Sequence, residues 1–156
     1  MQPTPDLSQV DSSYGRTTIW RVLTWSFVTA WMGFIFYWSS QSTLPGFNQS
    51  ILDLLFKKGC HITVFGALAL LSYRAIRHDL KHAHATTGAA ILAIGWAIID
   101  EIHQGFVPGR TAAALDVFID SIGVITILAM VQLRHNRLLL SKLTRGKLNA
   151  TNAKGK

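Results

Sequence analysis

Long runs of apolar residues dominate the chain and are separated by shorter polar segments. The most extended run, residues 19–38, contains a single charged side chain, Arg21, near its start. At about 1.5 Å per residue, a helix of this length reaches roughly 30 Å, the thickness of the hydrocarbon core of a bilayer. The pattern therefore predicts a membrane-spanning helix over this segment.

Three further apolar runs follow, at residues 60–76, 86–103 and 115–133. The second and third spans are short for a bilayer, so buried helices of a soluble bundle are the alternative. Residues 86–99, however, have no charge and no polar face, which favours the membrane. We predict an all-α, polytopic membrane protein: a four-transmembrane-helix bundle over residues 19–133, of undetermined oligomeric state.

The composition agrees with this prediction, because 49% of the residues are hydrophobic and only 15% are charged, unlike an ordinary soluble domain. A signal peptide is the competing interpretation of the first run. A polar segment containing Asp6 and Asp11 precedes that run, however, and no A-x-A cleavage site follows it. We therefore expect a retained anchor, preceded by a disordered cytoplasmic N-terminus over residues 1–18.

The basic residues are distributed asymmetrically around the predicted spans. Of the 15 Lys and Arg residues, all but Lys57, Lys58 and Arg110 lie before the first span, after the second or after the fourth. The positive-inside rule then places both termini in the cytoplasm, and the loops 39–59 and 104–114 outside. We expect a multi-pass protein of the bacterial cytoplasmic (inner) membrane with its N- and C-termini inside.

The excess of positive charge does not require a nucleic-acid partner. The bases lie where anionic lipids of the cytoplasmic leaflet favour them, and no aromatic or arginine-rich reading surface accompanies them. The segment 134–156 begins with "RHNRLLLSKLTRGKL", which mixes leucines and bases. We interpret it as a basic cytoplasmic interfacial helix followed by a tail. Membrane lipids are the expected partners, and nucleic acid is not.

Acidic residues gather at the opposite, predicted outer side. Asp100 and Glu101 end the third span, while Asp116 and Asp120 begin the fourth. A charge at the centre of a membrane helix costs about 2.5–3.5 kcal/mol, so such a cluster needs partners or a wet cavity. Gly123 continues the face of the two later acids and would let another helix come close.

Partners for these acids are present at the same depth. Lys58 and His61 share one face at the start of the second span, and His103 and Gln104 share a face with Asp100. Pro108 and Gly109 suit a type II turn that would fold Arg110 back towards the carboxylates. Arginine suits that role because its planar fork grips a carboxylate or phosphate through two hydrogen bonds.

These residues match a family pattern: the chain resembles the VanZ-like integral membrane proteins over residues 30–125. The resemblance rests on "FYWSSQS" at the end of the first span and on three spaced motifs. The motifs are "KxxHxxxFxxL" (Lys58, His61, Phe65, Leu68), "DExxQxFxPGR" (Asp100 to Arg110) and "DxxxDxxG" (Asp116, Asp120, Gly123). Two positions depart from the family pattern: Lys57 stands where an Asp is common, and Asp120 where an Asn is common.

The resemblance implies a helical protein of the bacterial cytoplasmic membrane and cell envelope. Some members of that family are associated with resistance to the glycopeptide teicoplanin. No agreed reaction carries over, so whether this chain is an enzyme stays open.

Three functions are compatible with a charged, outward-facing pocket. The first is binding of a lipid or envelope-precursor head group, or of a glycopeptide, in an accessory role. The second is acid–base catalysis on a lipid-linked substrate, and the third is movement of protons or small ions. A purely structural charge network that locks the helices together is the alternative to all three. The predicted ligand-binding residues are Lys58, His61, Asp100, Glu101, Gln104, Arg110, Asp116 and Asp120.

Candidates for catalysis are Asp100, Glu101, His61 and His103, with a carboxylate as base and a histidine as acid. We expect no cofactor and claim no metal, because no H-E-x-x-H or cysteine-pair spacing accompanies the histidines.

Several other polar or reactive residues receive a plainer interpretation. The run "HDLKHAH" at residues 78–84 is interpreted as a solvated cytoplasmic loop. Trp20 and Trp38 are interpreted as interface anchors. The lone cysteine, Cys60, is expected to serve packing. The serines and glutamine of 39–42 are candidates for hydrogen bonds into the pocket.

Overall fold

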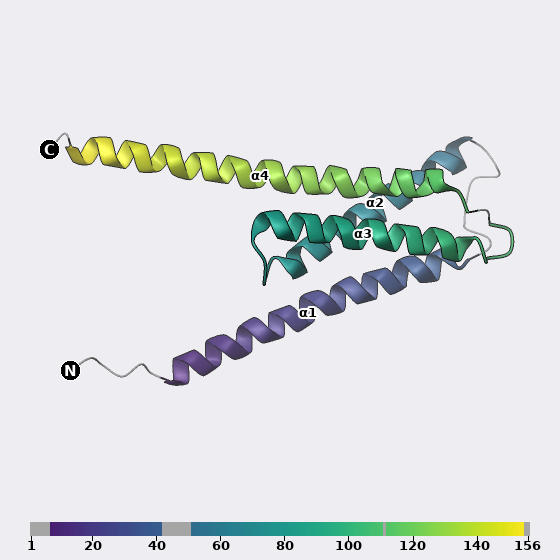
Figure 1. Ribbon diagram of the computed structural model, residues 1–156, viewed down its shortest axis with the longest axis horizontal. Coiled ribbons are helices and arrows are strands. Elements are labelled where there is room, and N and C mark those ends of the chain that lie inside the picture. The colour runs from purple at the N-terminus through teal and green to yellow at the C-terminus, as the bar shows by residue number, and fades with distance from the viewer. Residues whose placement is uncertain (1–6, 42–50, 111, 155–156) are drawn as a thin grey trace.

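The computed structural model consists of four α-helices that pack side by side (Figure 1). They are α1 (Leu7–Ser39), α2 (Ile51–Ile76), α3 (His82–Gln104) and α4 (Ala114–Lys154). The structure describes residues 7–41, 51–110 and 112–154, and no strand occurs within those ranges. Each helix contains a segment long and apolar enough to cross a membrane: Thr18–Ser39, Leu55–Ile76, His82–Gln104 and Ala114–Gly146. The predicted all-α, four-span membrane protein is confirmed.

All four helices extend beyond the predicted spans: α2 begins at Ile51, inside the segment 39–59 that we expected to be a loop, and α1 and α4 extend furthest. Helix α1 begins at Leu7, so residues 7–18, which we expected to be disordered, have a helical backbone. Helix α4 continues through the basic segment to Lys154 rather than giving way to a separate interfacial helix. No proline interrupts either segment, so nothing in the chain forces the helix to stop. The remaining residues of the predicted termini, 1–6 and 155–156, lie outside the described residues.

The connections alternate between the two ends of the bundle. The free end of α1, the free end of α4 and the α2–α3 turn lie on one side (Figure 1). At the other end, α1 and α3 finish while α2 and α4 begin. We call this second end the distal end; Asp100, Glu101, Arg110, Asp116 and Asp120 lie there. Helices α2 and α4 consequently run in the same direction.

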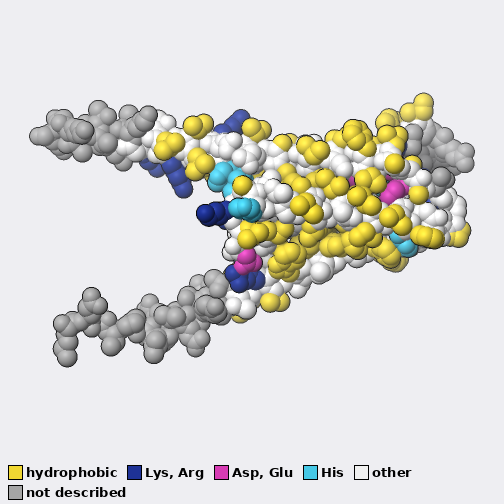
Figure 2. Space-filling model, in the orientation of Figure 1, with side chains coloured by type: hydrophobic (Ala, Val, Ile, Leu, Met, Phe, Trp, Pro, Cys, Tyr) yellow, Lys and Arg dark blue, Asp and Glu magenta, His cyan; other side chains and the backbone are white. Residues whose placement is uncertain are grey.

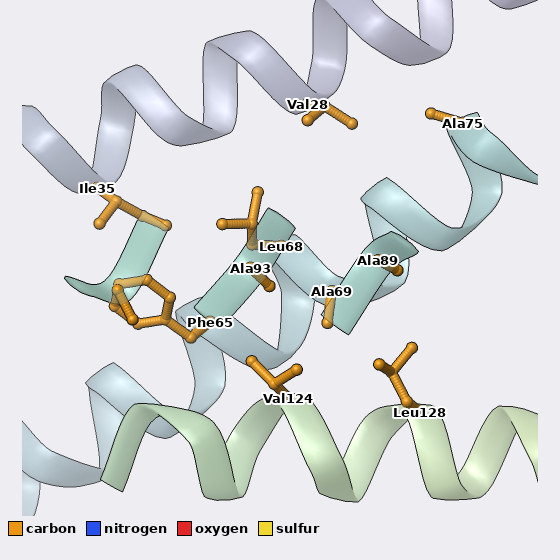
Figure 3. Close-up of a cluster of buried hydrophobic side chains, with 11 residues drawn as sticks. Val28, Ile35, Phe65, Leu68, Ala69, Ala75, Ala89, Ala93, Val124 and Leu128 are labelled. Carbon is orange, nitrogen blue, oxygen red and sulfur yellow. The ribbon is translucent and has the colours of Figure 1, made fainter. Parts of the chain in front are cut away.

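Small side chains bring the helices together. Ala85, Ala89, Ala93 and Ala97 recur every fourth residue along α3, and all four are buried. Such a stripe lets α3 lie close to its neighbours, as small residues do in membrane helices generally. Larger side chains fill the rest of the core (Figure 3): Val28 and Ile35 from α1, Phe65 and Leu68 from α2, and Val124 and Leu128 from α4.

The closest approach is between α2 and α4. A Cβ atom added at Gly123 would overlap the backbone carbonyl of Ile62, and one at Gly66 would lie 3.2 Å from the carbonyl oxygen of Gly123. The two backbones therefore touch about three turns into α2 and two and a half turns into α4, counted from the distal end. Because the helices are parallel, residues that precede the contact on each helix stay within reach of one another.

The bundle exposes much of its apolar surface. Large hydrophobic side chains such as Trp20, Phe27, Ile91 and Phe118 are exposed along the helices. Figure 2 shows apolar side chains over much of the visible flank and charged ones towards the two ends. A flank of this kind suits a protein surrounded by lipid rather than by water.

The end opposite the distal end has polar contacts that the sequence did not predict. Arg21 of α1 forms an ion pair with Asp79 in the α2–α3 turn. His82 is not in a solvated loop: it begins α3, is buried, and lies 2.8 Å from the Tyr73 hydroxyl and 2.7 Å from Gln132 Oε1. The interpretation of the whole 78–84 run as loop was wrong because the helix starts inside it.

Candidate functional site

Two polar pairs join α2 to α4 at the distal end. Lys58 Nζ lies 2.5 Å from Asp116 Oδ1, and His61 Nδ1 lies 3.2 Å from Asp120 Oδ1. Lys58 and Asp116 are partly exposed, whereas the side chain of Asp120 is only 2% exposed. The spacings of three on α2 and four on α4 place each pair on the face that leads to the backbone contact. These contacts stabilise the parallel helix pair.

A chain of hydrogen bonds connects α3 to Arg110. Asp100 Oδ2 accepts a hydrogen bond from Gln104 Nε2 (2.9 Å), and Gln104 Oε1 accepts one from Arg110 Nη1 (3.1 Å). Arg110 Nε also donates to the backbone carbonyl of Gln41 (3.0 Å). The guanidinium thus ties the end of α1 to the end of α3.

The turn before Arg110 has the predicted form. The Arg110 amide donates to the Val107 carbonyl (3.1 Å), and Gly109 has a positive φ of 82° after Pro108. This is a type II turn, in which glycine accepts the left-handed conformation. We expected this turn to bring Arg110 onto a carboxylate, and it does not. The Gln104 side-chain amide lies between Asp100 and Arg110 instead, because it can donate to the carboxylate and accept from the guanidinium.

Glu101 and His103 have partners of their own. Glu101 is buried, and its Oε1 accepts a hydrogen bond from the backbone amide of Ala113, which fastens the α3–α4 connection to α3. His103 Nε2 lies 3.0 Å from Ser40 Oγ, and its ring stacks on Phe36 with centroids 4.0 Å apart. Both residues thereby hold neighbouring segments in place.

A cavity of about 400 Å³ opens between α1 and α2 near this network. Phe34, Ile35 and Trp38 of α1 face Phe56 and Val64 of α2 across it. Its polar lining consists of Ser39, Lys57, Cys60, His61, Asp100 and Arg110. A space with apolar walls and a few polar groups is the usual form of a small-molecule site.

The predicted site residues divide into two groups. His61, Asp100 and Arg110 line the cavity. The others are held in the surrounding network: Lys58, Glu101, Gln104, Asp116 and Asp120.

Part of the cavity lining was not predicted from the sequence. Lys57 was noted as an outer base and as a departure from the family pattern, and the apolar residues of the walls were not predicted to form a site. Cys60 was expected to be packed, but it is exposed and lines the cavity. The prediction for residues 39–42 gave a partial signal: Ser40 and Gln41 make the contacts described above, and Ser42 lies outside the described residues.

Two buried polar atoms at the cavity have no hydrogen-bond partner among the described residues. They are Asp100 Oδ1 and Ser39 Oγ. Asp100 is 1% exposed and Ser39 is 5% exposed. Among the described residues, Arg110 forms no ion pair. Its guanidinium donates to the Gln104 side-chain oxygen and to the Gln41 backbone carbonyl. The residues around the cavity therefore include an acid and an arginine with hydrogen-bonding capacity to spare.

Comparison with known proteins gives one match. The family model described as VanZ/LLP1 matches residues 17–135. This range includes the distal part of each of the four spans and every residue of the network. No curated protein matches, and no solved structure does.

The His61–Asp120 pair leads to a prediction. Replacing Asp120 by Asn keeps an oxygen that can accept from His61, so we expect unfolding stability within about 1 kcal/mol of wild type. Replacing Asp120 by Leu, which is also branched at Cγ but has no acceptor, leaves His61 without that partner and should cost about 1–3 kcal/mol. Thermal unfolding of the purified proteins in detergent measures both. Equal losses in the two variants would show that the hydrogen bond does not stabilise the bundle.

Proposed function

The chain belongs to the VanZ/LLP1 family, and from this premise we propose that its distal cavity binds the anionic head group of an envelope lipid or lipid-linked precursor. The observation that carries the proposal is the position of Arg110 on the cavity wall, held by two neutral oxygens. A guanidinium anchored in this way keeps its full positive charge and can still form charge-assisted hydrogen bonds to a phosphate.

The shape and composition of the cavity also support a lipid. Its walls carry phenylalanine, tryptophan and aliphatic side chains, while the charged groups lie at the end of the bundle. An amphiphile could place its head group at Arg110 and the first part of its chains against the aromatic residues. A volume of about 400 Å³ suits a head group better than an entire glycopeptide.

The two other functions have less support from the geometry. Glu101 is engaged by a backbone amide and His103 by Ser40, so an acid–base reaction in the cavity would rely on Asp100 and His61. Ion movement needs polar groups through the bundle, yet the core beyond the distal end contains Phe65, Leu68 and Val124. We therefore place binding ahead of catalysis and transport.

We further propose that the distal end faces the outside of the cytoplasmic membrane and that both termini face the cytoplasm. The support is the charge asymmetry: apart from Lys57, Lys58 and Arg110, the bases lie towards the other side. The same asymmetry puts Arg110 where it meets lipids of the outer leaflet.

The proposed binding predicts that Arg110→Ala releases lipid. Wild-type protein purified in mild detergent should retain phospholipid, and the variant should retain at least about tenfold less, because a charge-assisted contact to phosphate is lost. Mass spectrometry of the co-purified lipids measures the difference. Arg137→Ala, which removes an exposed base near the opposite end, is the matched control. Equal retention in wild type and Arg110→Ala would contradict the proposal.

The proposed orientation predicts the reactivity of Cys60. In intact spheroplasts, a membrane-impermeant maleimide should label this exposed thiol without permeabilisation. The control is the double variant Cys60→Ser, Ser141→Cys, whose thiol lies on the exposed far part of α4 and should react only after lysis. Labelling of Cys60 that requires lysis, together with labelling at position 141 that does not, would reverse the orientation.

A further inference from the structure

The cavity carries a negative group as well as a positive one. Asp100 is one of the residues that line the cavity, and its side chain is almost completely buried. Its Oδ1 accepts no hydrogen bond from any described residue. An ionised carboxylate oxygen can only accept hydrogen bonds. Whatever occupies the adjacent space is therefore favoured if it presents a donor to this oxygen, and most favoured if that donor is cationic.

Asp100 and Arg110 are linked through one side chain. A single side chain, Gln104, bridges them: its amide nitrogen donates to Asp100 Oδ2 at 2.9 Å and its oxygen accepts from Arg110 Nη1 at 3.1 Å. The negative and positive groups are thus one amide apart.

Other polar pairs at the distal end do not offer the same opportunity. The carboxylates of Asp116 and Asp120 lie against Lys58 and His61 respectively. Glu101 Oε2 is also buried without a partner, but among the described acids only Asp100 lines the cavity. Ser39 Oγ, also buried and without a partner, adds a hydroxyl that can donate to a phosphate oxygen.

We propose, as a refinement that rests on the lipid-binding function above, that the cavity selects a zwitterionic phospholipid whose primary ammonium neighbours its phosphate. The phosphate contacts Arg110 and the Ser39 hydroxyl, and the ammonium donates to Asp100 Oδ1. A head group with only negative charge would place a second anion beside a buried carboxylate, which costs free energy. An ethanolamine head group satisfies both ends.

The test uses full-length protein in nanodiscs made of equal parts phosphatidylethanolamine and phosphatidylglycerol with identical acyl chains. Native mass spectrometry after release measures the ratio of the two lipids that stay bound. We expect wild type to be enriched in phosphatidylethanolamine and Asp100→Asn to lower the ratio at least about tenfold, as expected for losing one strong charge-assisted contact. Asp79→Asn removes a carboxylate at the opposite end of the bundle, away from the cavity, and should leave the ratio unchanged.

The outcomes separate this refinement from the function on which it rests. If Arg110→Ala leaves total bound lipid unchanged, lipid binding at this cavity is wrong. If bound lipid depends on Arg110 but wild type shows no enrichment in phosphatidylethanolamine, or Asp100→Asn keeps the enrichment, only the refinement is wrong.

A second measurement uses wild-type protein alone, so it does not depend on whether a variant folds. In wild-type protein, successive N-methylation of the ethanolamine nitrogen removes hydrogen-bond donors and retains the charge. We expect retention to fall along the series and to be lowest for phosphatidylcholine, which has no N–H to donate to Asp100. Retention of phosphatidylcholine equal to that of phosphatidylethanolamine would overturn the proposed donor contact.

Discussion

The contact of α2 with α4 at Gly123 is the constraint on which the distal end depends. The backbone of Ile62 occupies the space where any other residue at position 123 would place a Cβ atom. Because the two helices run parallel from this end, their separation there sets the distance between side chains one or two turns earlier. Lys58 reaches Asp116, and His61 reaches Asp120, only because the backbones are this close. In lipid, where burial of apolar surface does not drive helices together, close packing and polar pairs of this kind supply much of the association.

The pairs and the cavity have complementary roles. Lys58, Asp116 and Asp120 hold α2 and α4 together, and Glu101 fastens the α3–α4 connection, so these charges compensate one another or are engaged by backbone. Among the residues that line the cavity, Asp100 and Arg110 keep unused hydrogen-bonding capacity. A charge network that locks the helices and a binding pocket are therefore parts of one arrangement, in which the first positions the second.

Much of the architecture could be predicted from hydropathy, because a helix in lipid must be apolar over its length: residues 19–38 became the span Thr18–Ser39. The presence of opposite charges at one depth was also predictable from topology. Which acid meets which base was not, since Lys58 pairs with Asp116 rather than with Asp100 through the register of α2 against α4. Nor could the sequence place Gln104 between Asp100 and Arg110, or show that Cys60 borders a cavity, because both depend on tertiary packing.

The most direct measurement is the unfolding stability and lipid retention of Gly123→Ala beside Gly95→Ala. A Cβ at Gly95 of α3 meets no atom within 4 Å, so that variant tests the cost of a methyl group without a clash. The account predicts that Gly123→Ala lowers the free energy of unfolding by about 1–3 kcal/mol and reduces lipid retention, whereas Gly95→Ala does neither. Stability and retention at wild-type levels in Gly123→Ala would contradict the claim that this contact organises the distal end.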